Sequence, residues 1–100
     1  MTTSISKKDS ELKVKVEGQL DAVTSEEFIK TVENELEGVE SIEIDCVGLE
    51  YISSAGLRAL VALSNDLADP DNAVSLTHVG EQVGEVLRLT GMNELFKIID

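Results

Sequence analysis

Two consecutive serines, Ser53 and Ser54, lie where an apolar strand-like segment gives way to a helix-like pattern. In open α/β sheets, ligands and partners gather where strand C-terminal ends meet helix N-termini, because free N–H groups point outward there. A phosphate on Ser54 would be favoured at a helix N-terminus by about 0.3–1 kcal/mol. Serine is also a preferred N-cap, so the pair alone is more typical of a simple helix cap than of a modified site.

Gly56 and Asp21 leave similar alternatives open. Glycine near the start of a helix is costly unless something approaches the backbone closely, either a partner or phosphate, or a strand packed beneath. Asp21 precedes a second helix-like segment, where an aspartate caps a helix, stabilises a turn or contributes to an interface. Arg58 is expected to be a solvated residue or a partner contact.

Enzyme chemistry is poorly supported by the remaining residues. A serine nucleophile needs an adjacent base, and the only histidine, His78, has no carboxylate at a telling spacing. The Gly-x-Ser-x-Gly nucleophile elbow and glycine-rich phosphate loops are absent, and one Cys and one His far apart predict no metal site. We therefore expect neither catalysis nor a cofactor.

The elements that would position these residues follow from hydrophobic periodicity. Leu12, Val14 and Val16 alternate with charged residues, which predicts a strand buried on one face, preceded by a short antiparallel edge strand over 3–6. A Thr24–Glu27 capping box and the helical spacing of apolar residues predict a helix over 25–37, with Gly38 as its left-handed stop.

The rest of the chain continues this alternation. We expect a short strand at 42–47, then, after Gly48, a segment 49–52 that leads into Ser53, and further strands at 73–79 and 96–99. We also expect a helix over 54–67 ended by Asp69, Pro70, Asp71 and Asn72, and a short helix over 83–89 closed at Gly91. Right-handed crossovers then make the sheet mostly parallel. The fold class is α/β, a single domain over 1–100 with four or five strands and helices packed on them.

Composition limits the partners and the compartment. The chain has 20 acidic and 8 basic side chains and a net charge of −12, so it repels nucleic acid. Such acidity is typical of a solubility feature, and it would also favour a protein with a basic face. The single cysteine, Cys46, lies in an apolar stretch and suits a buried hydrophobe in a reducing compartment. Residues 1–10 lack the apolar segment of a secretory signal, and no stretch approaches ~20 apolar residues, so we expect a cytoplasmic protein without membrane insertion.

The segment Tyr51–Leu57 resembles the phosphorylation motif of STAS-domain anti-sigma factor antagonists, in which an aromatic and an aliphatic residue precede Asp, Ser, Ser or Thr, Gly and Leu. Aligned on Gly56 and Leu57, the phosphorylated serine of that family falls on Ser54. Two further segments resemble the family's signatures, namely Gly18, Gln19, Leu20 and Asp21 and the C-terminal Leu89, Gly91, Leu95 and Phe96. Ser53 replaces the family's Asp and Ala55 its second hydroxyl, which leaves Ser53 as the second candidate acceptor.

The resemblance implies a partner-switching function. The unphosphorylated form would bind an anti-sigma factor that is a serine kinase and release its sigma factor, phosphorylation of Ser54 would switch binding off, and a metal-dependent serine phosphatase would reset it. The expected contact residues are Asp21, Thr24, Ser53, Ser54, Gly56, Leu57 and Arg58. The alternative is a STAS assembly module of a transporter or stress-signalling complex that is not phosphorylated, which Ser53 in place of Asp favours.

Overall fold

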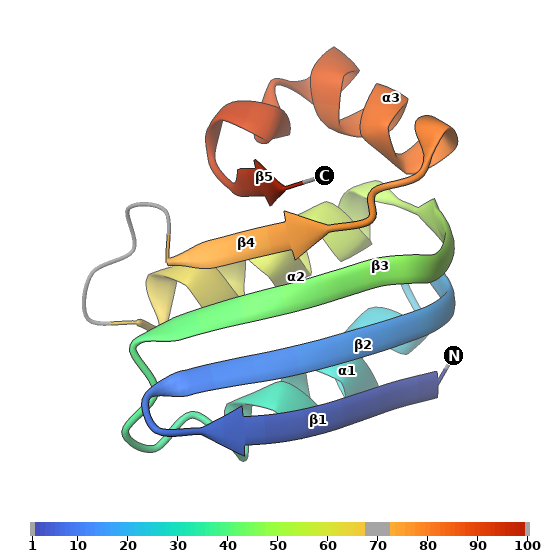
Figure 1. Ribbon diagram of the computed structural model, residues 1–100. Helices are drawn as coiled ribbons and strands as arrows, with labels where there is room; N and C mark the ends of the chain where they lie inside the picture. The colour runs from blue at the N-terminus through green and yellow to red at the C-terminus, as the bar shows by residue number, and fades with distance from the viewer. Residues whose placement is uncertain (1, 68–72, 100) are drawn as a thin grey trace.

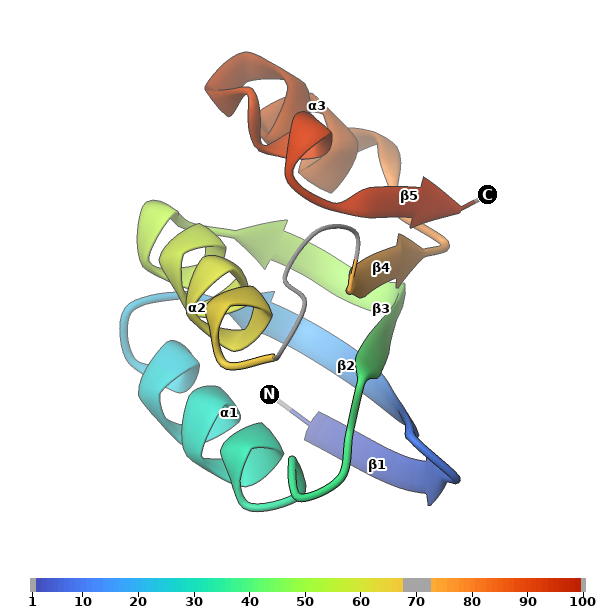
Figure 2. The same ribbon diagram turned by 90° about the vertical axis from the view of Figure 1, so that its left-hand side faces the viewer.

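The computed structural model describes residues 2–67 and 73–99, in which a five-stranded sheet is covered on one face by helices (Figures 1 and 2). The strands are β1 (Thr2–Lys8), β2 (Glu11–Leu20), β3 (Ser41–Ile52), β4 (Val74–Thr77) and β5 (Lys97–Ile99), and they lie in that order across the sheet. β1 is antiparallel to β2, and every other neighbouring pair is parallel. The expected mixed α/β sheet with an antiparallel N-terminal edge strand is confirmed.

Three α-helices and one 3₁₀ turn connect the parallel strands: α1 (Thr24–Glu33), α2 (Ser54–Asn65), α3 (Glu81–Thr90) and η1 (Met92–Glu94). Figure 2 shows α1 and α2 side by side against the same face of the sheet, with α3 at the β4–β5 edge. A sheet with one covered face needs strands that are apolar on that face only. This requirement explains the alternation in the sequence.

β2 and β3 form the centre of the core. The side chains of Leu12, Val14 and Val16 on β2 are buried beneath the helices, as are Ile42 and Ile44 on β3. The residues between them face the opposite side of the sheet, where Lys13 pairs in register with Glu43 and Lys15 with Asp45. The uncovered face is therefore polar, and opposite charges lie across neighbouring strands.

The predicted end of α1 is wrong by one turn, because the helix ends at Glu33 rather than at residue 37. The N–H groups of Glu35 and Leu36 bond back three residues, to Val32 and Glu33, which tightens the chain out of the α-helical pattern. Acidic side chains at a helix C-terminus also oppose the macrodipole. Gly38 has the expected positive φ, +76°, but it serves a separate turn before β3.

The other predicted elements exist with different bounds. β3 is one continuous strand with two register shifts against β2, whereas the Gly48 position had suggested two segments. α2 begins at Ser54 as expected and ends at Asn65, two residues early; the proposed helix terminator at 69–72 lies outside the described residues. β4 stops at Thr77, because His78 adopts a positive φ of 54° that leaves the strand.

Gly56 fixes the first turn of α2 against the end of β2. A Cβ added at Gly56 would lie 2.6 Å from the carbonyl oxygen of Leu20 and 2.8 Å from Cγ1 of Ile52, which is closer than real contacts allow. Gly56 is buried, so of the two readings of this glycine the structure supports close packing on a strand rather than approach by a partner.

We expect Gly56→Ala to destabilise the protein by about 1–3 kcal/mol, because overpacking outweighs the gain in helix propensity. Gly84→Ala is the matched control: it also adds a methyl within a helix, but its Cβ would meet Cγ1 of Val79 at an ordinary 3.5 Å. That variant should gain up to about 1 kcal/mol. Urea unfolding measures both, and equal effects of the two substitutions would contradict the packing role of Gly56.

Candidate functional site

The C-terminal ends of β2 and β3 lie side by side and bring two loops together. Leu20 pairs with Ile52 in the parallel register, and the N–H of Ser53 donates to the carbonyl oxygen of Leu20 at 2.9 Å. The chain then enters α1 through Asp21 and α2 through Ser53. The two residues that the sequence singled out therefore follow neighbouring strands at one edge of the sheet.

Asp21 organises the loop before α1. Its Oδ1 accepts the N–H groups of Val23 and Thr24, both at 3.0 Å, and its own N–H donates to the Thr24 hydroxyl oxygen at 2.9 Å. The pKa of Asp21 is lowered from 3.8, chiefly because the N–H of Thr24 donates to the carboxylate. The charged form of Asp21 is thus the form that holds the loop.

The predicted capping box of Thr24 and Glu27 is wrong in its partners. Thr24 is the first residue of α1, and the residue before it, Val23, makes no side-chain cap. The Thr24 hydroxyl lies 2.9 Å from the carbonyl oxygen of Gln19 and 3.2 Å from Oδ1 of Asp21. Asp21 takes over the capping from three residues upstream.

Ser53 is the N-cap of α2. Its hydroxyl oxygen accepts the N–H of Gly56 at 3.2 Å, and its carbonyl oxygen accepts the N–H of Leu57 at 2.9 Å. The extended backbone of Ser53, with φ −94° and ψ 174°, is the usual conformation of such a cap. The hydroxyl of Ser53 is therefore engaged in holding the helix start.

Ser54, by contrast, presents a free hydroxyl. It is the first residue of α2 and its side chain is exposed. Over residues 2–67 and 73–99 its hydroxyl makes no hydrogen bond. This oxygen is open to solvent, and modifying it would break no hydrogen bond within the described structure.

The remaining expected contact residues divide by burial. Thr24 is half-buried and Arg58, one turn after Ser54 on α2, is exposed, so both side chains reach solvent. Gly56 and Leu57 are buried, with Leu57 only 3% exposed, so they lie beneath that surface and support it. Val23 belongs to no motif in the sequence, yet its side chain is 83% exposed in the loop that Asp21 holds.

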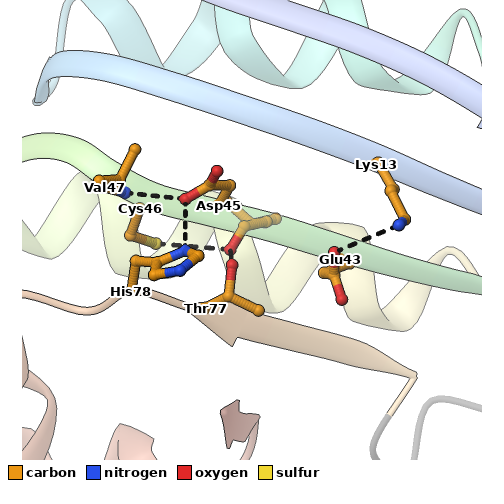
Figure 3. Close-up of polar contacts among 8 residues, drawn as sticks. Lys13, Glu43, Asp45, Cys46, Val47, Thr77 and His78 are labelled. Carbon is orange, nitrogen blue, oxygen red and sulfur yellow. Dashed lines mark hydrogen bonds and ion pairs between the residues drawn. The ribbon is translucent and has the colours of Figure 1, made fainter. Parts of the chain in front are cut away.

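His78 has a carboxylate partner that the sequence did not reveal. Its Nδ1 lies 3.0 Å from Oδ1 of Asp45, which also accepts the N–H of Val47 (Figure 3). Asp45 and His78 are 33 residues apart in sequence, and they meet because Asp45 pairs with Thr77 in the β3–β4 register. The sequence spacing around His78 therefore did not indicate this carboxylate.

Cys46, the cysteine beside the His78–Asp45 pair, is poorly suited to act as a nucleophile. Cys46, next to Asp45, is buried, and burial raises the pKa of its thiol to about 12. The thiolate is therefore scarce at neutral pH. Among the described residues no group of three or more His, Cys, Asp or Glu could hold a metal ion, and none of the described helices could span a membrane.

The sheet order, the helix arrangement and the paired loops at Asp21 and Ser53 define a STAS domain. Residues 3–99 match the family model described as "Mlab, STAS domain", and the chain belongs to this family. The anti-sigma-B factor antagonist of Staphylococcus epidermidis is 28% identical over 91 residues, which cover 90% of this chain and 84% of that protein.

Two solved structures of SpoIIAA share the fold. The anti-sigma factor antagonist SpoIIAA in its unphosphorylated form gives a TM-score of 0.83 at 14% identity, covering 99% of this chain and 89% of that chain. The Bacillus cell fate determinant SpoIIAA in the phosphorylated form gives a TM-score of 0.73 at 13% identity, covering 99% of this chain and 92% of that chain. The resemblance to anti-sigma factor antagonists is confirmed by these comparisons.

We expect Ser53→Ala to destabilise the protein by about 1 kcal/mol, because the N–H of Gly56 loses its acceptor. Ser53→Asp should keep wild-type stability, since aspartate caps a helix as well as serine does. Chemical denaturation of the two variants and the parent measures the difference. An equal loss in both variants would contradict the assignment of Ser53 as the cap.

Asp21→Ala should lower the melting temperature at pH 7, because the loop loses an acceptor for two N–H groups. The lowered pKa of Asp21 means that its contribution is fully present above the ordinary value of 3.8 and is lost as the pH falls through the lower folded value. The difference between parent and variant should therefore shrink below pH 3.8. Asp21→Asn is the control: it does not titrate there, so its difference from Asp21→Ala should not change with pH.

Proposed function

We propose that this chain is an anti-sigma factor antagonist whose unphosphorylated form binds an anti-sigma factor and releases the sigma factor held by it. The anti-sigma factor is itself a serine kinase, and it inactivates this chain by phosphorylating Ser54. A metal-dependent serine phosphatase restores the binding form. In this cycle, which we place in the cytoplasm, the chain is a substrate and a ligand rather than an enzyme.

The observation that carries the proposal is the exposed hydroxyl of Ser54, which makes no hydrogen bond to any described residue, beside the engaged hydroxyl of Ser53. The Ser54 oxygen would attack the γ-phosphorus of kinase-bound ATP, the bond from that phosphorus to ADP would break, and the hydroxyl proton would pass to a base of the kinase. The resemblance of Tyr51–Leu57 to the family's phosphorylation motif supports the same position, since Ser54 aligns with the phosphorylated serine of that motif. The second candidate, Ser53, would have to give up its bond to Gly56.

The charge of the added group explains the change in binding. Phosphate adds about −1.5 to −2 charges beside Asp21, in a chain that already carries a net charge of −12. A partner whose surface fits the unmodified loops would have to bury this dianion. A hundredfold loss of affinity corresponds to about 2.7 kcal/mol, a loss that one unpaired buried charge can account for.

An assembly module that is not phosphorylated is the second candidate. The observation that favours it is Ser53, which caps α2 without the negative charge that the phosphorylation motif carries beside the acceptor. In that function Ser54 would be a contact residue only. Incubation with the candidate kinase partner and ATP, followed by mass spectrometry, separates the two: phosphate on Ser54 supports the antagonist, and its absence with every partner supports the module.

We expect Ser54→Asp to weaken binding to the kinase partner at least about tenfold, because a carboxylate places part of the phosphate's charge at the same position. Ser54→Ala should bind as tightly as the parent and accept no phosphate. Ser6→Asp is the matched control, since Ser6 is an exposed serine on β1 and the substitution changes the net charge equally. Titration calorimetry measures all three; tight binding of Ser54→Asp would contradict the charge mechanism.

A further inference from the structure

Arg58 is the one basic residue of α2, and it lies one helical turn after Ser54. Its side chain is exposed, and within residues 2–67 and 73–99 it makes no ion pair and no side-chain hydrogen bond. An exposed guanidinium with five donors and no bond to an acceptor among the described residues is available to bind. The question is which anion it serves.

The helix geometry directs Arg58 toward Ser54. Residues four apart in a helix lie on the same face, one above the other. Long helical side chains lean toward the N-terminus and cover the turn before their own Cα, so the guanidinium of Arg58 is within reach of the turn that begins at Ser54. The order of an acidic group followed four residues later by a basic one is also the favourable order for a helical ion pair.

The elements next to α2 carry acidic side chains near this end of the sheet. Asp21 lies in the loop before α1, Glu26 in the first turn of α1 and Glu50 near the end of β3, and all three are acidic. A phosphate on Ser54 would add to the negative charge that these carboxylates place at the C-terminal ends of β2 and β3. Arg58 is the cation that the same helix provides against that charge.

We infer that Arg58 binds the phosphate of phosphorylated Ser54 through an i, i+4 ion pair on α2. This inference rests on the proposed phosphorylation of Ser54 and adds a second component to the switch. In the unmodified chain Arg58 is free to contact an acidic group of the partner. After phosphorylation the planar guanidinium is held by the phosphate, so the partner meets new negative charge and also loses a positive contact.

The test installs phosphoserine at position 54 during translation, so that no kinase or partner is needed. The change in melting temperature on phosphorylation is measured in the parent and in Arg58→Gln. We expect this change to be more favourable in the parent by about 2–4 °C, because only the parent can form the ion pair. In about 1 M salt the difference should largely disappear, since exposed charges are screened.

Two further variants identify the interaction. Arg58→Lys keeps the charge but not the planar fork, and should retain only part of the difference. Arg88→Gln removes the other arginine, which is exposed on α3, and should leave the parent's response unchanged. Comparing the change on phosphorylation within each variant cancels any effect that the substitution itself has on the fold.

An equal response in the parent and in Arg58→Gln, or an equal loss with Arg88→Gln, would overturn the inference. Neither result depends on whether a kinase recognises the chain. The proposed function fails by a different observation, the absence of phosphate on Ser54 with candidate kinases. The two proposals can therefore fail separately.

Discussion

The candidate site depends on the contacts that Ser53 and Gly56 make with the carbonyl oxygen of Leu20. This oxygen accepts the N–H of Ser53 at 2.9 Å, which extends the pairing of β2 and β3 by one residue, and the same oxygen faces the bare Cα of Gly56. A side chain at position 56 would push the first turn of α2 away from β2. Because Gly56 has no side chain, the start of α2 can pack against Leu20, the residue before Asp21. The loops at Asp21 and Ser53 therefore lie next to each other.

The two serines divide the work at this position. The hydroxyl oxygen of Ser53 caps α2 by accepting the N–H of Gly56, and the extended backbone of Ser53 allows this bond. Ser54 is already helical, so its side chain points outward and the cap does not need it. One serine thus stabilises the helix start and the next is exposed to solvent. A modification of Ser54 therefore need not disturb the start of α2.

The sequence predicted the features that depend on local periodicity, and it missed those that depend on pairing between distant segments. Alternation of Leu12, Val14 and Val16 identified the central strand, because one buried face imposes a period of two. The meeting of Asp45 with His78 depends on the β3–β4 register, which no spacing in one segment reveals. The role of Gly56 was left open for the same reason, since the atom it accommodates belongs to β2.

The surface around Ser54 is separated from the core in a way that suits a charge switch. Leu57 and Gly56 are buried directly beneath it, so a rigid support lies under exposed polar groups. A dianion added to such a surface stays in water and costs the fold little, whereas the same dianion at an interface must lose its water or find a cation. The free energy of the modification is therefore expressed mainly when a partner binds. In the proposed switch the fold stays the same, and the charges beside Ser54 determine how strongly the phosphate opposes binding of a partner.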